Sequence, residues 1–183
     1  MDSDSTPTQR VGLLCGASPN QSHMRLFIDD SVGTVKLDVT GAATAFDTTW
    51  RPIAFTCDAS HNYVSYANGA VDLSGTYASG GTFNSALRTT IGAITTSSGT
   101  GSFYGGAIAH VATWTRVLSA QEVKSLSNGL LPSHLGPTHY WPLWGVDSPE
   151  PDLVSGGVDG TLTGTTQGAG GPPVGLSLLR LAA

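Results

Sequence analysis

The chain has 183 residues, enough for one domain with a sizeable hydrophobic core. Gly, Ser and Thr supply 66 of them, hydrophobic residues make up 39%, charged residues make up only 11%, and the net charge is −5. This composition excludes charge-driven disorder, and two Lys with two Glu are too few for a coiled coil or a helical bundle. We therefore expect a single all-β domain with many strands and turns.

The charge distribution also limits the partners. Eight Lys and Arg are spread along the chain, so no basic patch is available for nucleic acid. No apolar run reaches the roughly 18–20 residues of a membrane span. The start, Met1–Ser5, is acidic and polar, so we expect no signal peptide in this chain.

Five apolar runs in the first half of the chain are predicted to be strands: Val11–Cys15, Met24–Ile28, Val35–Val39, Trp50–Cys57 and Tyr63–Ala67. The alternation of Val35–Val39 indicates a strand with one buried face and one solvated face. Asn68 and Gly69 follow the fifth run at once and predict a tight hairpin, because both residue types tolerate positive φ.

The second half is expected to begin with loops over residues 74–107, followed by a central strand over Ile108–Trp114. A short helix is predicted over residues 119–128. Ser119 is its N-cap, Glu122 completes a capping box, and Gly129 ends it. Thr161–Thr163 is predicted to be a short strand.

Two cysteines, Cys15 and Cys57, lie inside predicted strands. One interpretation is that both are free thiols that pack as small hydrophobic side chains. The alternative is a disulfide between neighbouring strands, which needs Cα atoms within about 7 Å. No CxxC spacing points to a metal or redox site.

Four segments together resemble laminin-G-like domains: Trp50–Asp58, Tyr66–Gly69, Ile91-Gly92 and Gly106–Ser119. They match the patterns W-h-h-V-A-v-t-y-D, Y-V-N-G, l-x-I-G and G-x-I-D-E-V-R-I-Y-N-R-A-L-S in order and spacing. The resemblance covers residues 10–130 and implies membership of the concanavalin A-like lectin/glucanase superfamily. Its fold is a two-sheet antiparallel jelly-roll sandwich, found in lectins, bacterial adhesins and phage virion proteins.

Three features depart from that pattern. Ala109 and His110 replace its acidic pair, Pro52 replaces a strand residue that donates a backbone hydrogen bond, and only a short arm precedes Val11. However, Tyr140–Leu143, Asp152–Gly157 and Gly160–Leu162 resemble the stretch that often opens such a domain. We therefore expect an arm over 1–9, a sandwich over 10–135, completing strands over 136–167 for this chain or a neighbour, and a Gly/Pro-rich tail with an apolar end over 168–183.

Catalysis is not expected. Glycosidases need a pair of carboxylates, whereas Glu122 belongs to a helix cap and Glu150 to a Pro-rich turn, and no G-x-S-x-G motif is present. The only cofactor considered is calcium, which lectin-like sandwiches often hold on loop carboxylates. Asp29, Asp30 and Asp58 lie at strand ends and are its candidate ligands.

Candidate glycan contacts are loop residues that combine stacking rings with a polar group: Tyr77, Tyr104, Trp144 and Asn68. The leading hypothesis is a non-catalytic structural or recognition protein on a phage-type virion surface, assembled with other protein subunits as a homo-oligomer or shell. The alternative is a carbohydrate-binding or adhesion module of a secreted bacterial protein, with a cell-surface glycan as partner. The expected location is accordingly a virion surface or the extracellular space.

Overall fold

The computed structural model describes residues 10–15, 22–30, 33–80, 90–96, 99–101, 103–145, 148–168 and 171–172. The predicted arm and the apolar end of the tail therefore lie outside the described residues. Contacts divide the chain into two compact units. The first comprises Met1–Arg51, Phe55–Ala67 and Val71–Gly106, and the second comprises Pro52–Ala54, Asn68–Ala70 and Ala107–Ala183.

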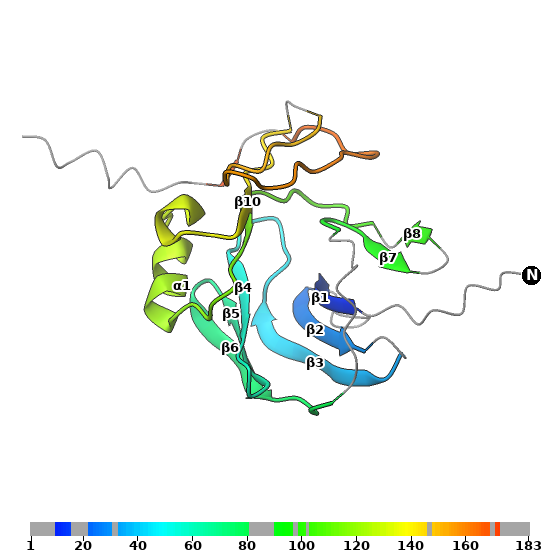
Figure 1. The fold of residues 1–183 in the computed structure, drawn as a ribbon, viewed down its shortest axis with the longest axis vertical. Helices are drawn as coiled ribbons and strands as arrows, with labels where there is room; N and C mark the ends of the chain where they lie inside the picture. Colours follow the sequence, from blue (N-terminus) through cyan, green and yellow to red (C-terminus); the bar gives the residue numbers. More distant parts are fainter. Residues whose placement is uncertain are drawn as a thin grey trace, which may run out of the picture. The chain divides into compact units, whose positions relative to one another are not determined.

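The first unit is built on two antiparallel sheets. One has the order β1-β2-β3, with β1 over Arg10–Cys15, β2 over His23–Asp29 and β3 over Val35–Thr44. The other has the order β4-β5-β6, with β4 over Ile53–Cys57, β5 over Asn62–Ala67 and β6 over Ala70–Thr76. A hairpin of β7 (Ile94–Thr96) and β8 (Gly99–Gly101) follows them along the chain (Figure 1).

Side chains from both sheets form one apolar core in this unit. Leu26, Ile28, Leu37 and Tyr63 are buried at its centre, and Leu13, Val39, Phe55, Leu73 and Tyr77 pack around them. The central residues of β2 alternate across the sheet, so Arg25 and Phe27 lie on the opposite face. There the guanidinium of Arg25 lies 5.2 Å from the ring centre of Phe27 and pairs with Asp38 of β3. The all-β sandwich expected from the sequence is confirmed.

The second unit contains the helix α1 over Ala120–Ser127, a short 3₁₀ helix over Pro132–Leu135 and the antiparallel strands β9 (Val111–Thr113) and β10 (His139–Trp141). The capping box of Ser119 and Glu122 is present as predicted. Leu130 N–H bonds to the carbonyl of Ser125 and Gly129 N–H to that of Leu126, while Gly129 has φ 94°. This Schellman motif ends the helix where the sequence placed its end.

Two predicted strand limits were wrong for local reasons. The strand expected from Trp50 begins at Ile53, because the turn before it is closed by Asp47, which bonds to Thr49 and Arg51, and because Pro52 has no N–H for a ladder. The strand expected over Ile108–Trp114 is limited to Val111–Thr113, since His110 has a left-handed φ of 55°.

Two further elements differ from the prediction. Thr161–Thr163 does not form a strand, and an isolated bridge between Glu150 and Gly160 lies beside it instead. The loops expected over residues 74–107 contain the end of β6 and the β7–β8 hairpin. The Asn68-Gly69 hairpin is confirmed, with φ of 53° and 72° at its two central residues.

Candidate functional site

The turn between β4 and β5 is organised by Asp58. Its Oδ1 accepts the N–H groups of Ser60 and Asn62, both at 2.9 Å, and its Oδ2 accepts Asn62 Nδ2 at 2.8 Å. These bonds, above all the one from the Asn62 side chain, lower the pKa of Asp58. Asn62 in turn accepts the hydroxyl of Thr76 at the end of β6. The Asp58 carboxylate therefore stabilises the β4–β5 turn in which it lies.

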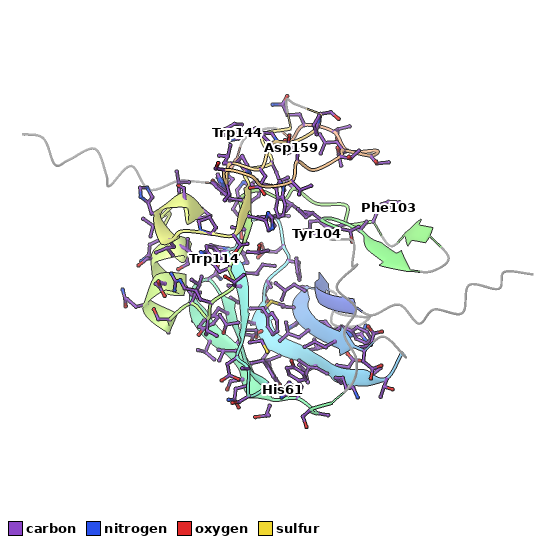
Figure 2. All side chains as sticks on the ribbon, in the orientation of Figure 1. His61, Phe103, Tyr104, Trp114, Trp144 and Asp159 are labelled. Carbon is purple, nitrogen blue, oxygen red and sulfur yellow. The ribbon has the colours of Figure 1, made fainter. Side chains whose placement is uncertain are left out.

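Cys57 and Tyr77 meet directly beside this turn. The thiol of Cys57 lies 3.5 Å from Tyr77 Oη and 3.4 Å from the carbonyl of Asp58. The ring of His61, labelled in Figure 2, packs edge-on against Tyr77 with 4.9 Å between ring centres. Burial, with the Cys57 thiol second, raises the pKa of Tyr77 to about 12. The structure thus gathers Cys57, Asp58 and Tyr77, which the sequence analysis had assigned to three different roles.

Cys57 is a free thiol in this structure. This is the first of the two alternatives that the sequence left open for this residue, and no disulfide joins it to Cys15. The side chain of Cys15 lies outside the described part, so the state of that residue stays a prediction.

The two other candidate calcium ligands lie at the end of β2. Asp29 and Asp30 are both only 2% exposed. Oδ1 of Asp30 accepts the N–H of Thr34 at 2.8 Å, and Lys36 Nζ lies 3.2 Å from its Oδ2. Among the described residues, no three of the His, Cys, Asp and Glu side chains gather as metal ligands would. Calcium binding stays a prediction.

The segment after β10 is held together by one buried carboxylate. Asp152 Oδ1 accepts the N–H groups of Tyr140 and Val154, at 2.9 and 3.0 Å. Its Oδ2 accepts Nδ1 of His139 at 2.6 Å and the N–H of Val158 at 3.2 Å. The His139 ring also stacks on Trp141, whose indole N–H donates to the carbonyl of Val158.

A second buried carboxylate holds the loop that displays Trp144. Glu150 is only 1% exposed, and its Oε1 accepts the N–H of Trp144 at 2.7 Å. Two neighbours of Trp144 have left-handed backbones, Leu143 with φ 57° and Gly145 with φ 69°. Trp144 is 53% exposed as a residue and lies on the segment after β10 (Figure 2). An exposed aromatic side chain on a fixed, strained backbone has the geometry of a binding platform.

The remaining glycan candidates are placed differently. Asn68 is exposed at the β5–β6 hairpin, in the second unit with Trp144. Tyr104 belongs to the first unit with Tyr77, is half-buried, and packs edge-on against Phe46 with 5.8 Å between ring centres. Tyr77 is half-buried by His61 and Cys57. Of the four candidates, Trp144 alone has an aromatic face largely open to a ligand.

Both glutamates of the chain have structural partners. Glu122 bonds to the N–H of Ser119 and pairs with Arg116, which together lower its pKa to about 2, while Glu150 binds the Trp144 loop. The sequence places Glu150 only in a turn, and it does not predict a role for the side chains of His139 and Asp152. The one available signal was that Glu150 and Asp152 alternate with prolines directly after an aromatic run.

Comparison with known families places the chain in a superfamily. The family model described as the concanavalin A-like lectin/glucanases superfamily, of the laminin G type, matches residues 2–124. Searches of curated proteins and of solved structures found no significant match to this chain. Within the described residues, no helix has the length and apolar character to cross a bilayer.

Proposed function

Because the chain belongs to the concanavalin A-like lectin/glucanase superfamily, we propose that it is a non-catalytic carbohydrate-binding domain whose sugar platform is the indole of Trp144. The observation that carries this proposal is the display of Trp144. The residue is 53% exposed although its backbone N–H is bonded to a buried carboxylate. Laminin-G-like domains are typically non-catalytic, which fits the structural use of both glutamates.

The chemistry of an indole suits a sugar ring. The CH groups on one face of a pyranose form an apolar patch, and a flat aromatic face covers it without needing a deep pocket. Polar groups beside the ring can bond the hydroxyls, and Gln167 lies next to Trp144, with its Nε2 3.4 Å from the Trp144 carbonyl. A single platform binds weakly, so such a domain would act through several copies.

The test is binding to an array of immobilised glycans, with calcium and with EGTA, by the full chain and by two variants. Trp144→Ala should lower affinity at least about tenfold, or 1.4 kcal/mol. Trp50→Ala is the matched control, because Trp50 is also exposed, at 38%, but lies in the first unit. Equal binding by the Trp144→Ala variant and the parent would refute the assignment. A signal that depends on calcium would support Asp29 and Asp30 as calcium ligands.

A structural subunit is the second candidate function, and exposed aliphatic side chains favour it. Val158 is 70% and Leu153 is 48% exposed, and both lie in the same segment as Trp144. Aliphatic side chains gain little from a sugar but are covered well by a protein surface. A virion surface, where many copies pack together, is the setting that we propose for this function.

Light scattering separates the two candidates. A stable oligomer that dissociates when Val158 is replaced by Asp, and that ignores every glycan, would favour the structural subunit. A monomer that binds a glycan through Trp144 would favour the carbohydrate-binding domain.

A further inference from the structure

Glu150 binds the main-chain N–H groups of Trp144 and Gly145, one with each oxygen of its carboxylate. Oε1 of Glu150 accepts the N–H of Trp144 at 2.7 Å, and Oε2 accepts the N–H of Gly145 at 3.4 Å. The short first bond is typical of a charge-assisted hydrogen bond. Glu150 thus contacts the backbone of the platform residue while its own side chain is closed off from solvent.

The backbone of Glu150 is itself anchored. Its N–H donates to the carbonyl of Gly160 and its carbonyl accepts the N–H of Gly160, each at 2.8 Å. A Cβ on Gly160 would meet Trp141 and Glu150 at 3.9–4.0 Å, an ordinary contact distance, so the bridge lies beside the Trp141 ring. The anchored backbone therefore fixes the position of the Glu150 carboxylate, and the carboxylate in turn fixes the N–H groups of Trp144 and Gly145.

The loop needs such a support because its backbone is strained. Leu143 has φ 57°, a left-handed conformation that residues with a Cβ rarely adopt. Pro142, directly before it, is buried, and its carbonyl accepts the N–H of His110 at 3.1 Å. Two fixed points, Pro142 on one side and Glu150 on the other, thus hold the turn in which the indole of Trp144 is presented.

We propose that Glu150 is the positioning residue of the carbohydrate platform: it sets the orientation of the Trp144 indole through the main chain and never touches the ligand. This inference rests on the proposed function of Trp144. It makes ligand affinity depend on a buried carboxylate that no sugar can reach, and it explains why an acidic residue is enclosed without a basic partner among the described residues.

The first test needs no variant. In the full chain, the amide of Trp144 should exchange with deuterium at least about a hundredfold more slowly than an unprotected amide, despite the exposed side chain, and its proton resonance should lie downfield. Exchange at the unprotected rate would overturn the inference, whatever the ligand.

The second test is the isosteric Glu150→Gln variant labelled with 5-fluorotryptophan. An amide group offers donors where the carboxylate offers acceptors, so one of the two loop N–H groups loses its partner. The fluorine resonance of Trp144, assigned with Trp144→Phe, should shift or broaden, while those of Trp50 and Trp114 stay in place. Affinity for the strongest-binding glycan of the array should fall about tenfold.

The outcomes separate the two proposals. If Trp144→Ala leaves glycan binding unchanged, the proposed function fails, whereas the exchange and fluorine measurements still decide the role of Glu150. If Trp144→Ala abolishes binding but Glu150→Gln changes neither the fluorine spectrum nor the affinity, the positioning role is wrong. Glu122→Gln is the matched control, because it makes the same replacement at a glutamate whose partners are Ser119 and Arg116, and it should alter affinity less than twofold.

Discussion

The carboxylate of Asp152 accepts Nδ1 of His139 at 2.6 Å across the start of the C-terminal segment, and its side chain is fully enclosed. The same two oxygens also accept three backbone N–H groups, from Tyr140, Val154 and Val158. One side chain therefore fastens β10 to the chain that follows it. This arrangement explains why a segment with almost no regular secondary structure keeps a defined conformation.

Replacing Asp152 by Asn should be strongly destabilising. The amide offers one acceptor oxygen to four donors, and its NH₂ group would face N–H groups, so buried donors lose their partners. We expect a loss of about 2–4 kcal/mol in the free energy of unfolding, measured by urea denaturation. Asp159→Asn is the matched control: Asp159 is exposed, and among the described residues it accepts only the N–H of Asp152, so we expect a loss of less than about 1 kcal/mol. Equal losses in the two variants would contradict the central role of Asp152.

Acid should weaken the fold through the same residue. Burial alone raises the pKa of Asp152, but the hydrogen bonds from Tyr140, His139 and Val154 outweigh it and bring the pKa below the ordinary value of 3.8. A carboxyl with a lowered folded-state pKa stabilises the protein above its unfolded-state pKa and loses that contribution as pH falls through the folded-state value. The urea midpoint should therefore drop below about pH 4.

Asp152→Asn provides the control for the acid effect, because it removes one titrating group and nothing else that is charged. The drop in midpoint between pH 7 and pH 3 should be smaller in the variant than in the parent chain. An identical drop would assign the acid sensitivity to the other carboxyls with lowered pKa, such as Asp38 beside Arg25 and Asp58 beside Asn62.

The helix and the hairpin could be predicted from the sequence, because short-range contacts determine both. Ser119, Glu122 and Gly129 defined the helix, and Asn68-Gly69 defined the hairpin, because each set acts within a few residues of its own backbone. The role of Glu150 was beyond such reasoning, since its partners depend on the reversal of the chain between Trp144 and Gly160. His110 shows the same limit: its backbone is left-handed just before β9, and its N–H donates to the carbonyl of Pro142, a partner far along the chain.

Gly41 should tolerate no side chain. Asp72 of β6 reaches β3, where its Oδ1 accepts the N–H groups of Ala42 and Ala43 at 3.0 and 2.8 Å. Its Oδ2 then lies against Gly41, so a Cβ there would overlap it. Gly41→Ala should displace the carboxylate and cost about 1–3 kcal/mol in thermal or urea unfolding.

Gly105→Ala is the control for this substitution, because Gly105 has open space around it among the described residues and no positive φ. It should change stability by no more than about 0.5 kcal/mol. The double variant Gly41→Ala/Asp72→Ala should lose less unfolding free energy than the two single variants lose together, because the overlap disappears with the carboxylate. Simple additivity would show that the two residues are not coupled.

Removing the capping box of α1 should cause a smaller loss of stability. Ser119 Oγ accepts the N–H of Glu122 at 3.3 Å, and Glu122 Oε2 accepts the N–H of Ser119 at 2.8 Å. Ser119→Ala removes the first bond and should cost about 1 kcal/mol of unfolding free energy. Ser133→Ala, an exposed serine outside the cap, should be neutral. A loss of equal size at both positions would mean that the cap contributes nothing specific.

Tyr77 should be among the last tyrosines to ionise. Its pKa is raised to about 12, first because burial disfavours the phenolate and second because the Cys57 side chain lies beside it. In a spectrophotometric titration, Tyr77→Phe should remove a late step, and Cys57→Ala should shift that step to lower pH. Tyr140→Phe provides the comparison, because burial raises the pKa of Tyr140 as well, without a thiol partner.

The raised pKa of Tyr77 also makes stability depend on pH. The protein should lose unfolding free energy as pH rises above the unfolded-state tyrosine pKa near 10, and the Tyr77→Phe variant should lose less of it. If Cys57→Ala leaves the late step in place, the thiol has no part in the shift and burial alone accounts for it.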